Sequence, residues 1–362
     1  ACATPVDLPP GLPVAGADAD SLVLIAGGDV IPMDAPGVLE DHSVLVREGR
    51  IVAVAPVAEL PAPPGARVVD ASGRWVIPGL IDMHVHINEA DLEAYVDHGI
   101  TTVRNMWGFA QLAGIIDDVE SGRARGPEIH SLSSGFDGSP IKWPQTQLVD
   151  DLSRIEPLIE AQVAQGYTEI KMYRDLSLAA YDSIVVVARN RGLTFAGHVP
   201  VRVGLDHVLA RGQRSIEHLG GYDPARLDVQ VPATVAAGAW NCPTLAIQGP
   251  ASVRPRLAVI VGALHAGGAR ILAGTDAGIG RTAPGASMAD ELALLVAAGL
   301  SPADALRAAT TNAAEYLGLE GEIGVIAPGA RADLVILDGN PLDDVGAVRL
   351  VRGVVLRGVF GS

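Results

Sequence analysis

Cysteine and aromatic residues are both scarce in this sequence. The chain has 362 residues, of which only Cys2 and Cys242 are cysteine, and aromatic residues make up 4%. Two cysteines form no disulfide framework and no cysteine-based zinc site, although a single pairing between them stays open. Cys242 directly precedes Pro243, and we expect it to be a small buried apolar residue.

Positive charge is in short supply as well. The chain has 26 Lys and Arg against 42 Asp and Glu, a formal net charge of −16, and no run of basic residues that would follow a phosphate backbone. No apolar run approaches the roughly 20 residues of a membrane-spanning helix. The sequence therefore excludes nucleic acid as a partner and predicts no transmembrane segment. The 42 Gly and 25 Pro indicate a globular protein with many tight turns.

The first twenty residues show neither helical nor strand periodicity and are rich in Pro, Ala and Asp, so we predict a flexible tail over residues 1–20. The sequence opens with Ala-Cys-Ala-Thr-Pro rather than with Met. In one interpretation, Cys2 is the lipid-attachment residue of a processed bacterial lipoprotein, which places the protein in the cell envelope or outside the cell. In the other, the tail is a remnant of cloning and the protein is cytoplasmic.

Short β-type runs separated by Gly, Asp and Pro occupy residues 21–75, where we expect a small antiparallel sheet, and the same texture returns in 322–362. Between them, apolar runs alternate with amphipathic helical stretches, which is typical of a parallel sheet or barrel. The sequence therefore predicts an α/β protein with a (β/α)8 TIM barrel over residues 76–321. A small β-sandwich domain built from both chain ends, 21–75 plus 322–362, is expected to flank it.

His84 and His86 lie two positions apart in an apolar strand-like run. Residues at this spacing face the same way, so the two imidazoles are able to hold one zinc-like ion, although two histidines at a strand end also occur at a plain surface. Lys171 lies in another apolar run, where an unpaired ammonium is costly. A carbamate formed from its amine and carbon dioxide would bridge two cations; the alternative is a lysine that extends to solvent.

His198, His218 and Asp276 each end a further strand-like run. Because the active sites of TIM barrels lie at the carboxyl ends of the strands, residues far apart in sequence are expected to converge there. The joint pattern of four histidines, one lysine and one aspartate is far more specific than any single member. We leave His98, His130, His207 and His265 as structural residues.

This set resembles the binuclear-metal amidohydrolase superfamily, near its prolidase-like and imidazolonepropionase-like branch. The motifs that carry the resemblance are the following: Val76-Ile-Pro-Gly-Leu-Ile-Asp-Met-His-Val-His, Thr101-Thr-Val-Arg, Gly274-Thr-Asp-Ala-Gly and Gly329-Ala-Arg-Ala-Asp-Leu-Val. The resemblance implies two divalent metal ions, which we expect to be zinc. It implies that His84, His86 and Asp276 bind the first ion, that His198 and His218 bind the second, and that carbamylated Lys171 and a hydroxide bridge them. Asp276 would carry the proton of this hydroxide to the leaving amine.

The resemblance further implies a substrate role for Tyr173, which lies two residues beyond Lys171, with simple aromatic packing as the alternative. Arg104 and Arg174 are candidates to bind a substrate carboxylate, with surface ion pairing as the alternative. We therefore predict hydrolysis of an amide bond in a dipeptide or N-acyl amino acid, a small-molecule substrate that bears a carboxylate. A homo-oligomer is a further expectation.

Two alternatives stay open. One is ring opening of a cyclic amide or a lactone, as in the imidazolonepropionase-like members, which generally use one metal ion and no bridging lysine. The other is a non-catalytic envelope binding lipoprotein built on an inactive barrel. Two features depart from the family pattern: Asn105 stands where many relatives have Asp, and the loop at 280–285 lacks a histidine. The segment at 135–144 is expected to form a lid.

Overall fold

The computed structural model describes residues 22–248 and 254–361. The predicted tail over residues 1–20, with Cys2, lies outside the described residues, so the localisation and the lipid attachment stay predictions. No helix in the described part of the chain combines the length and the apolar composition needed to cross a membrane.

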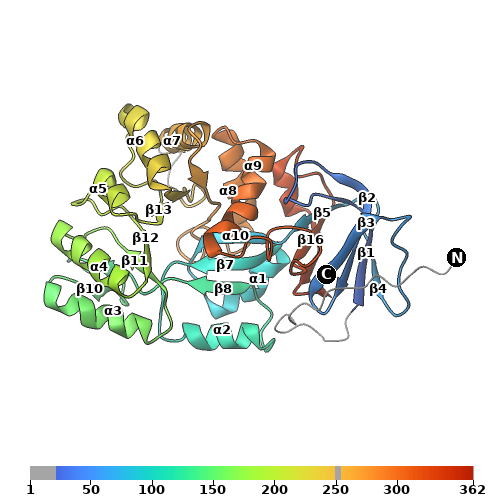
Figure 1. The fold of residues 1–362 in the computed structure, drawn as a ribbon, viewed down its shortest axis with the longest axis horizontal. Coiled ribbons are helices and arrows are strands. Elements are labelled where there is room, and N and C mark those ends of the chain that lie inside the picture. The colour runs from blue at the N-terminus through green and yellow to red at the C-terminus, as the bar shows by residue number, and fades with distance from the viewer. Residues whose placement is uncertain (1–21, 249–253, 362) are drawn as a thin grey trace.

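Both ends of the chain contribute strands to one eight-stranded sheet, drawn in blue and red on the right of Figure 1. Its strands are β1 (Leu22–Val30), β2 (Leu39–Arg47), β3 (Arg50–Pro56), β4 (Arg67–Asp70), β5 (Trp75–Pro78), β16 (Leu334–Leu337), β17 (Val351–Leu356) and β18 (Val359–Gly361). The two ends meet where β5 pairs antiparallel with β16. Alternate residues, such as Val23 with Ile25 and Leu334 with Ile336, form a core of their own on this sheet.

The prediction of a purely antiparallel sheet at the N-terminal end is wrong. β1 pairs antiparallel with β2, but it pairs parallel with β4 and with β5. Parallel neighbours need a crossover connection rather than a hairpin, and the part of the chain that holds β2 and β3 provides it between β1 and β4. Apolar alternation in the sequence indicates which face of a strand is buried, but it does not indicate which strand is its neighbour.

The middle of the chain forms parallel strands. Three of them, β6 (Leu80–Val85), β7 (Ile100–Asn105) and β8 (Glu128–Ser131), pair in that order. A seven-stranded sheet has the order β10-β9-β11-β12-β13-β14-β15. Its strands are β9 (Phe136–Asp137), β10 (Gln147–Leu148), β11 (Glu169–Met172), β12 (Thr194–Gly197), β13 (Ser215–Glu217), β14 (Trp240–Cys242) and β15 (Arg270–Ile271). Their parallel pairing agrees with the predicted alternation of strands and helices.

Backbone hydrogen bonds join these two sheets at two places, past β8 and past β15. Past β8, the amide of Ser133 donates to the carbonyl of Glu169 in β11 over 2.9 Å. Past β15, the carbonyl of Ala273 accepts from Met83 in β6 over 2.9 Å, and Asp276 donates to His84 over 2.7 Å. The carboxyl ends of strands from both sheets therefore lie close to one another.

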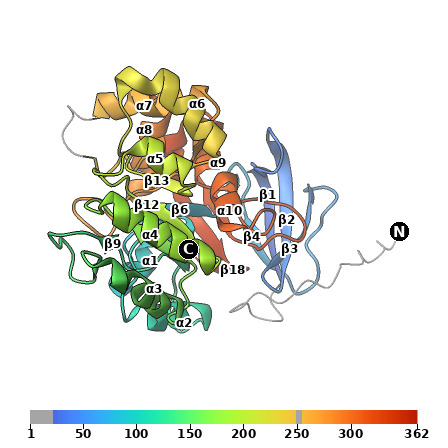
Figure 2. The ribbon, with the colours of Figure 1, turned by 60° about the vertical axis from the view of Figure 1, so that its left-hand side comes forward.

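The helices lie outside the parallel strands, and the sheet of the chain ends stands to one side (Figures 1 and 2). They are α1 (Leu92–Asp97), α2 (Leu112–Glu120), α3 (Ile155–Val163), α4 (Leu178–Asn190), α5 (Leu205–Ala210), α6 (Leu227–Ala237), α7 (Arg254–Ala266), α8 (Ser287–Ala297), α9 (Pro302–Ala308) and α10 (Thr311–Leu317). Short 3-10 turns are η1 (Glu89–Asp91), η2 (Leu152–Arg154), η3 (Pro224–Arg226) and η4 (Val345–Arg349).

Helix α4 shows why such segments fold as they do. Tyr181, Ile184, Val185 and Ala188 recur at helical spacing and are buried in the main core. The side chain of Ser177 accepts from the amide of Ala180 and so caps the helix. Helix α9 is capped in the same way, because the Ser301 hydroxyl accepts from the amide of Asp304.

Candidate active site

All six predicted metal ligands line one cavity of about 230 Å³. They come from different strand ends: His84 lies in β6 and His86 follows it, Lys171 lies in β11, His198 follows β12, His218 follows β13, and Asp276 lies beyond β15. Parallel pairing brings these ends together, since Lys171 pairs with Ala196 in β12 and Glu217 pairs with Cys242 in β14. The structure therefore brings together every member of the predicted set.

The backbone is strained where it leaves three of these strands. His218, Thr244 and Asp276 have φ values of 60°, 50° and 58°. This left-handed region is unfavourable for residues other than glycine and costs about 1–3 kcal/mol at each position. Such strain persists where the surrounding packing imposes it, and it clusters at functional sites. Its presence at three neighbouring strand ends supports a functional role for this cavity.

His84 is oriented by Glu217, a residue that the sequence prediction missed. Its Nδ1 lies 2.7 Å from Glu217 Oε2, and both side chains are buried. Burial by itself raises the pKa of Glu217, but Arg104 and His84 outweigh it and hold this pKa well below its usual range. An ionised carboxylate only accepts hydrogen bonds, so Nδ1 of His84 carries the proton. In the neutral imidazole this leaves the lone pair on Nε2, the nitrogen that lies 3.3 Å from Asp276.

The prediction that Arg104 binds a substrate carboxylate is not supported by the structure. Arg104 is 1% exposed and lines neither of the two cavities described here. Its guanidinium donates to the carbonyl of Met83 over 2.7 Å, to the hydroxyl of Ser215 over 3.2 Å and to Glu217 over 2.8 Å. A cation this deep needs a partner within the protein, and Glu217 supplies it. Arg104 acts on the site through Glu217, which contacts His84, and does not reach the cavity.

His218 and His198 are both neutral, but their Nδ1 atoms have different surroundings. Nδ1 of His218 lies 2.6 Å from the hydroxyl of Thr244, which itself donates to the carbonyl of Pro243. That hydroxyl proton is in use, so Nδ1 of His218 is the donor and its Nε2 is free to bind a cation. Burial and the charge of His84 lower the pKa of His218 to about 3. Nδ1 of His198 is buried and has no hydrogen-bond partner in the described structure.

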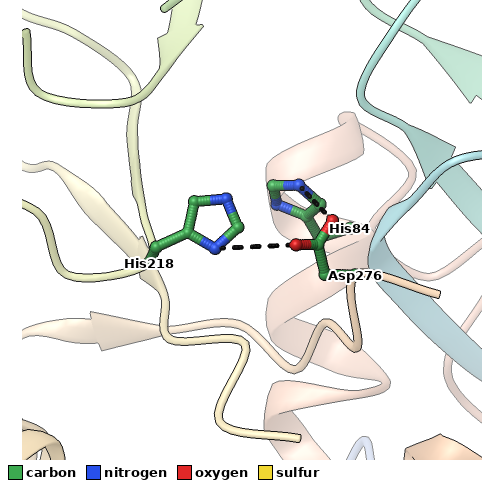
Figure 3. A group of neighbouring side chains, drawn as sticks. All are labelled: His84, His218 and Asp276. Atoms are coloured by element: carbon green, nitrogen blue, oxygen red, sulfur yellow. Dashed lines mark ion pairs between the residues drawn. The ribbon is translucent and has the colours of Figure 1, made fainter. Parts of the chain in front are cut away.

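Asp276 lies among the imidazoles, as Figure 3 shows for His84 and His218. Its Oδ1 lies 3.3 Å from Nε2 of His84 and 3.1 Å from Nε2 of His86, and its Oδ2 lies 4.0 Å from Nδ1 of His218. Burial alone raises the pKa of Asp276, but the surrounding imidazoles outweigh it and hold this pKa far below its usual range. The carboxylate is therefore ionised and available as a ligand.

Lys171 is 1% exposed, and no described side chain accepts a hydrogen bond from its ammonium. Burial lowers the pKa of Lys171 to about 8, although Glu217 and Asp276 oppose this shift. The neutral amine is consequently present in an appreciable fraction near neutral pH, which is the form that reacts with carbon dioxide.

The donor set fits divalent metal ions of the zinc type. Neutral imidazoles and a carboxylate are ordinary zinc ligands, and His84, His218 and Asp276 place their ligand atoms within 4.8 Å of one another. A second buried group, His84 with Glu217 and Cys242, is a poor site. Arg104 already occupies the carboxylate of Glu217, and burial raises the pKa of the Cys242 thiol, which keeps it protonated. Cys242 is the buried apolar residue that the sequence predicts.

Residues behind the ligands keep them in place. Asp82, also missed by the sequence prediction, is buried and accepts from the Thr275 hydroxyl over 2.6 Å and from the amide of His84 over 3.2 Å. It thereby ties β6 to the segment that carries Asp276. An aspartate or a glutamate within a run of apolar strand residues, as in Leu80-Ile-Asp and Ser215-Ile-Glu, was the signal in the sequence for Asp82 and Glu217.

Tyr173 and Arg174 lie on different sides of the ligand set. The hydroxyl of Tyr173 accepts from the indole nitrogen of Trp143 over 2.9 Å, and its ring packs edge-on against that of His198 at 4.4 Å. Arg174 lines a second cavity of about 570 Å³, which shares His198, His218 and Asp276 with the first. The structure therefore places both predicted substrate residues next to the ligand set.

Comparison with known proteins agrees with this site. A family model described as the amidohydrolase family matches residues 75–360, and the chain therefore belongs to the amidohydrolase family. The predicted class of enzyme is confirmed at the level of this family.

Similar proteins within the family carry several names. An adenine deaminase from Paracoccus denitrificans (strain Pd 1222) is 26% identical over 95% of this chain, which spans only 59% of that relative. An imidazolonepropionase from Acidiphilium cryptum (strain JF-5) is 28% identical over 89% of this chain and 94% of the relative. Among solved structures, a prolidase complexed with N-methylphosphonate-L-proline has a TM-score of 0.77 at 25% identity, over 94% of this chain and 100% of that one.

Proposed function

We propose that this chain is a metal-dependent hydrolase that cleaves the amide bond of a dipeptide or an N-acyl amino acid. The observation that carries the proposal is the position of Lys171, buried without an acceptor for its ammonium among four histidines and an aspartate that line the same cavity. The similarity to a prolidase complexed with a proline phosphonate supports an amide substrate of this kind.

The proposed architecture is a (β/α)8 barrel with a small β-sandwich domain from the chain ends, divided near residues 76 and 321. The backbone hydrogen bonds that join the two parallel sheets past β8 and past β15 support a closed ring of strands. In this architecture, substrate sites lie at the carboxyl ends of the strands, where the six residues meet.

We infer that His84, His86 and Asp276 hold one divalent ion, expected to be zinc, and that His198 and His218 hold a second. When bound, such ions supply Lewis acidity that polarises a carbonyl and makes a water molecule more acidic. Lys171 attacks carbon dioxide through its neutral amine, forms the N–C bond of a carbamate and releases one proton. The product is an anion with two oxygens, through which Lys171 would hold both ions.

Asp276 and Tyr173 act on the substrate. Asp276 accepts a proton from the attacking water and returns it to the nitrogen of the leaving amine, so that no free amide anion forms. The hydroxyl of Tyr173 accepts from Trp143, so its own proton is free to donate to a substrate oxygen. Glu217 and Arg104 keep His84 in one tautomer throughout.

Ring opening of a cyclic amide or a lactone is the second candidate, supported by the similarity to an imidazolonepropionase. Lys171 argues against it, because a single ion needs no bridging carbamate. The complete set of six ligands likewise argues against a non-catalytic binding lipoprotein.

The test is release of amine from a panel of dipeptides and N-acyl amino acids by protein loaded with zinc in bicarbonate buffer. Hydrolysis of a chemically related subset is expected. If no member of this panel releases amine and lactams or lactones are hydrolysed instead, the proposal is contradicted. The matched variant is Lys171→Ala, which should bind fewer zinc ions per chain and lose activity; two bound ions and full activity would refute the bridging role.

A further inference from the structure

The candidate ligands separate two cavities of different chemistry. His198, His218 and Asp276 line both the cavity of about 230 Å³ and the second cavity of about 570 Å³. A substrate whose scissile bond lies at these three side chains therefore extends into a cavity on each side. The walls of each cavity indicate which half of the substrate it accepts.

Apart from the ligand set, the smaller cavity is lined mainly by apolar and aromatic side chains, together with the amides of Asn105 and Gln145. Its described walls include Trp107, Phe109 and Trp143, with Ile87 and Ile279, and hold no charged side chain outside the six ligands. Two of the four tryptophans of the chain are gathered here. A wall of this kind excludes charged groups and favours a flat apolar one.

The size of this cavity suits one aromatic group. An apolar cavity of roughly 150 Å³ takes up a benzene ring, so about 230 Å³ accommodates a phenyl ring beside the ligand set that lines the same cavity. Trp143 is 40% exposed at the loop that borders the cavity, and Tyr173 holds it through its indole nitrogen. An exposed aromatic face beside a cavity is a surface for a substrate ring.

The larger cavity carries an unpaired cation. Among the described residues that line it, Arg174 is the only lysine or arginine, and Glu217 there is already paired with Arg104. No described carboxylate forms an ion pair with the Arg174 guanidinium, which is exposed. Gln248 lines the same cavity and offers an amide donor. A guanidinium in this position binds a carboxylate with two parallel hydrogen bonds.

We propose that the substrate spans both cavities, with an aromatic or bulky apolar acyl group in the smaller one and the carboxylate of its amino-acid half on Arg174 in the larger one. This inference rests on the proposed amide hydrolase function and specifies its substrate class. Trp143 and Arg174 are then the residues that select the two halves of the substrate.

The experiment is a panel of four amides that combine two acyl groups with two ends: phenylacetyl or acetyl on glycine, each with a free carboxylate or a carboxamide. Phenylacetylglycine should have the highest kcat/KM. Trp143→Ala should lower the preference for phenylacetyl over acetyl by about tenfold and leave the carboxylate preference unchanged. Arg174→Gln should lower the preference for carboxylate over carboxamide by about tenfold to a hundredfold and leave the acyl preference unchanged.

Matched controls are exposed residues near Trp143 and near the larger cavity. Ile141→Ala alters an exposed apolar residue of the loop that carries Trp143, and Arg202→Gln alters an exposed arginine outside the lining of both cavities. Both controls should keep both preferences. Equal loss of both preferences in either test variant, or equal kcat/KM for all four amides in the wild type, would overturn the inference.

Binding without turnover separates this inference from the proposed function. Ketomethylene isosteres of the four amides, in which CH2 replaces the amide nitrogen, are titrated into the zinc-loaded protein by calorimetry. The same order of affinity and the same variant effects are expected. If no amide is hydrolysed but this order holds, the reaction is wrong and the two subsites stand; if amides are hydrolysed and the order is absent, only the subsites are wrong.

Discussion

Replacement of Arg104 by methionine tests whether the buried pair beneath the site is as important as its geometry indicates. The change removes the 2.8 Å ion pair to Glu217, which is 0% exposed in its side chain, and two further hydrogen bonds. Glu217 then stays buried as a carboxylate without its cation. Breaking one side of a buried pair costs about 3–5 kcal/mol of unfolding free energy.

A double-mutant cycle with Glu217→Gln isolates the interaction free energy between Arg104 and Glu217. Glu217→Gln alone leaves a buried guanidinium without its counter-charge and should cost a similar amount, about 3–5 kcal/mol. The double variant removes both charges, so it should be at least about 2 kcal/mol more stable than the sum of the two single changes predicts. The exposed pair Arg226–Asp206, at 3.0 Å, is the control, and Arg226→Met should cost less than about 1 kcal/mol.

The assay is urea unfolding of metal-stripped protein in a chelator, followed by circular dichroism and by tryptophan fluorescence. Coincident transitions are needed before free energies are extracted. A cost below about 1 kcal/mol for Arg104→Met, or additivity within about 0.5 kcal/mol in the cycle, would refute the argument that Glu217 depends on Arg104 for its charge.

Three further predictions concern the surroundings of the site. Burial raises the pKa of Glu291 to about 8. The unfolded chain releases this proton near its ordinary pKa while the folded chain keeps it, so the wild type loses stability from about pH 4.5 to pH 8. Glu291→Gln should therefore match the wild type near pH 4.5 and exceed it by up to about 5 kcal/mol at pH 8.5 in urea unfolding; an equal difference at both pH values would contradict this. Gly274→Ala places a Cβ 2.4 Å from Cys242 Sγ and 2.8 Å from His84 Cβ, and should cost about 1–3 kcal/mol and weaken zinc binding, whereas Gly114→Ala in α2, which meets nothing within 4 Å, should be neutral or stabilising. Thr244→Val removes the acceptor that orients His218, and should reduce zinc affinity about 10–100-fold in a competition titration with a chelator; unchanged affinity would show that the 2.6 Å contact does not set the ring orientation.

The helices and strands near the site were largely predictable. Helix α4 follows from the local sequence pattern, because its apolar residues repeat at helical spacing behind a serine cap. The runs that end at His84, Lys171, His198 and His218 lie in or beside β6, β11, β12 and β13, because each is a short apolar run between turn residues. Local patterns of this kind can be recognised without knowing which strands pair with one another.

The role of a charged side chain was not predictable in the same way. Arg104 and Arg174 look alike in the sequence. Arg104 is buried and paired with Glu217, whereas Arg174 lines an open cavity. The difference depends on whether a partner strand places a carboxylate opposite the guanidinium. β13 supplies Glu217 to Arg104 across a separation of 113 residues, and no described strand does so for Arg174.

The sequence by itself determined the family of the protein, the alternation of strands and helices, and the six candidate ligands, because each is carried by a residue type at a local spacing. Only the tertiary structure decided which groups support that set and which line the cavities around it. It placed Glu217 and Asp82 behind His84, set Thr244 against His218, and divided the space around the ligands into an aromatic and a cationic cavity. These relations join residues from different strands, and the burial that fixes their charges exists only once the strands have assembled.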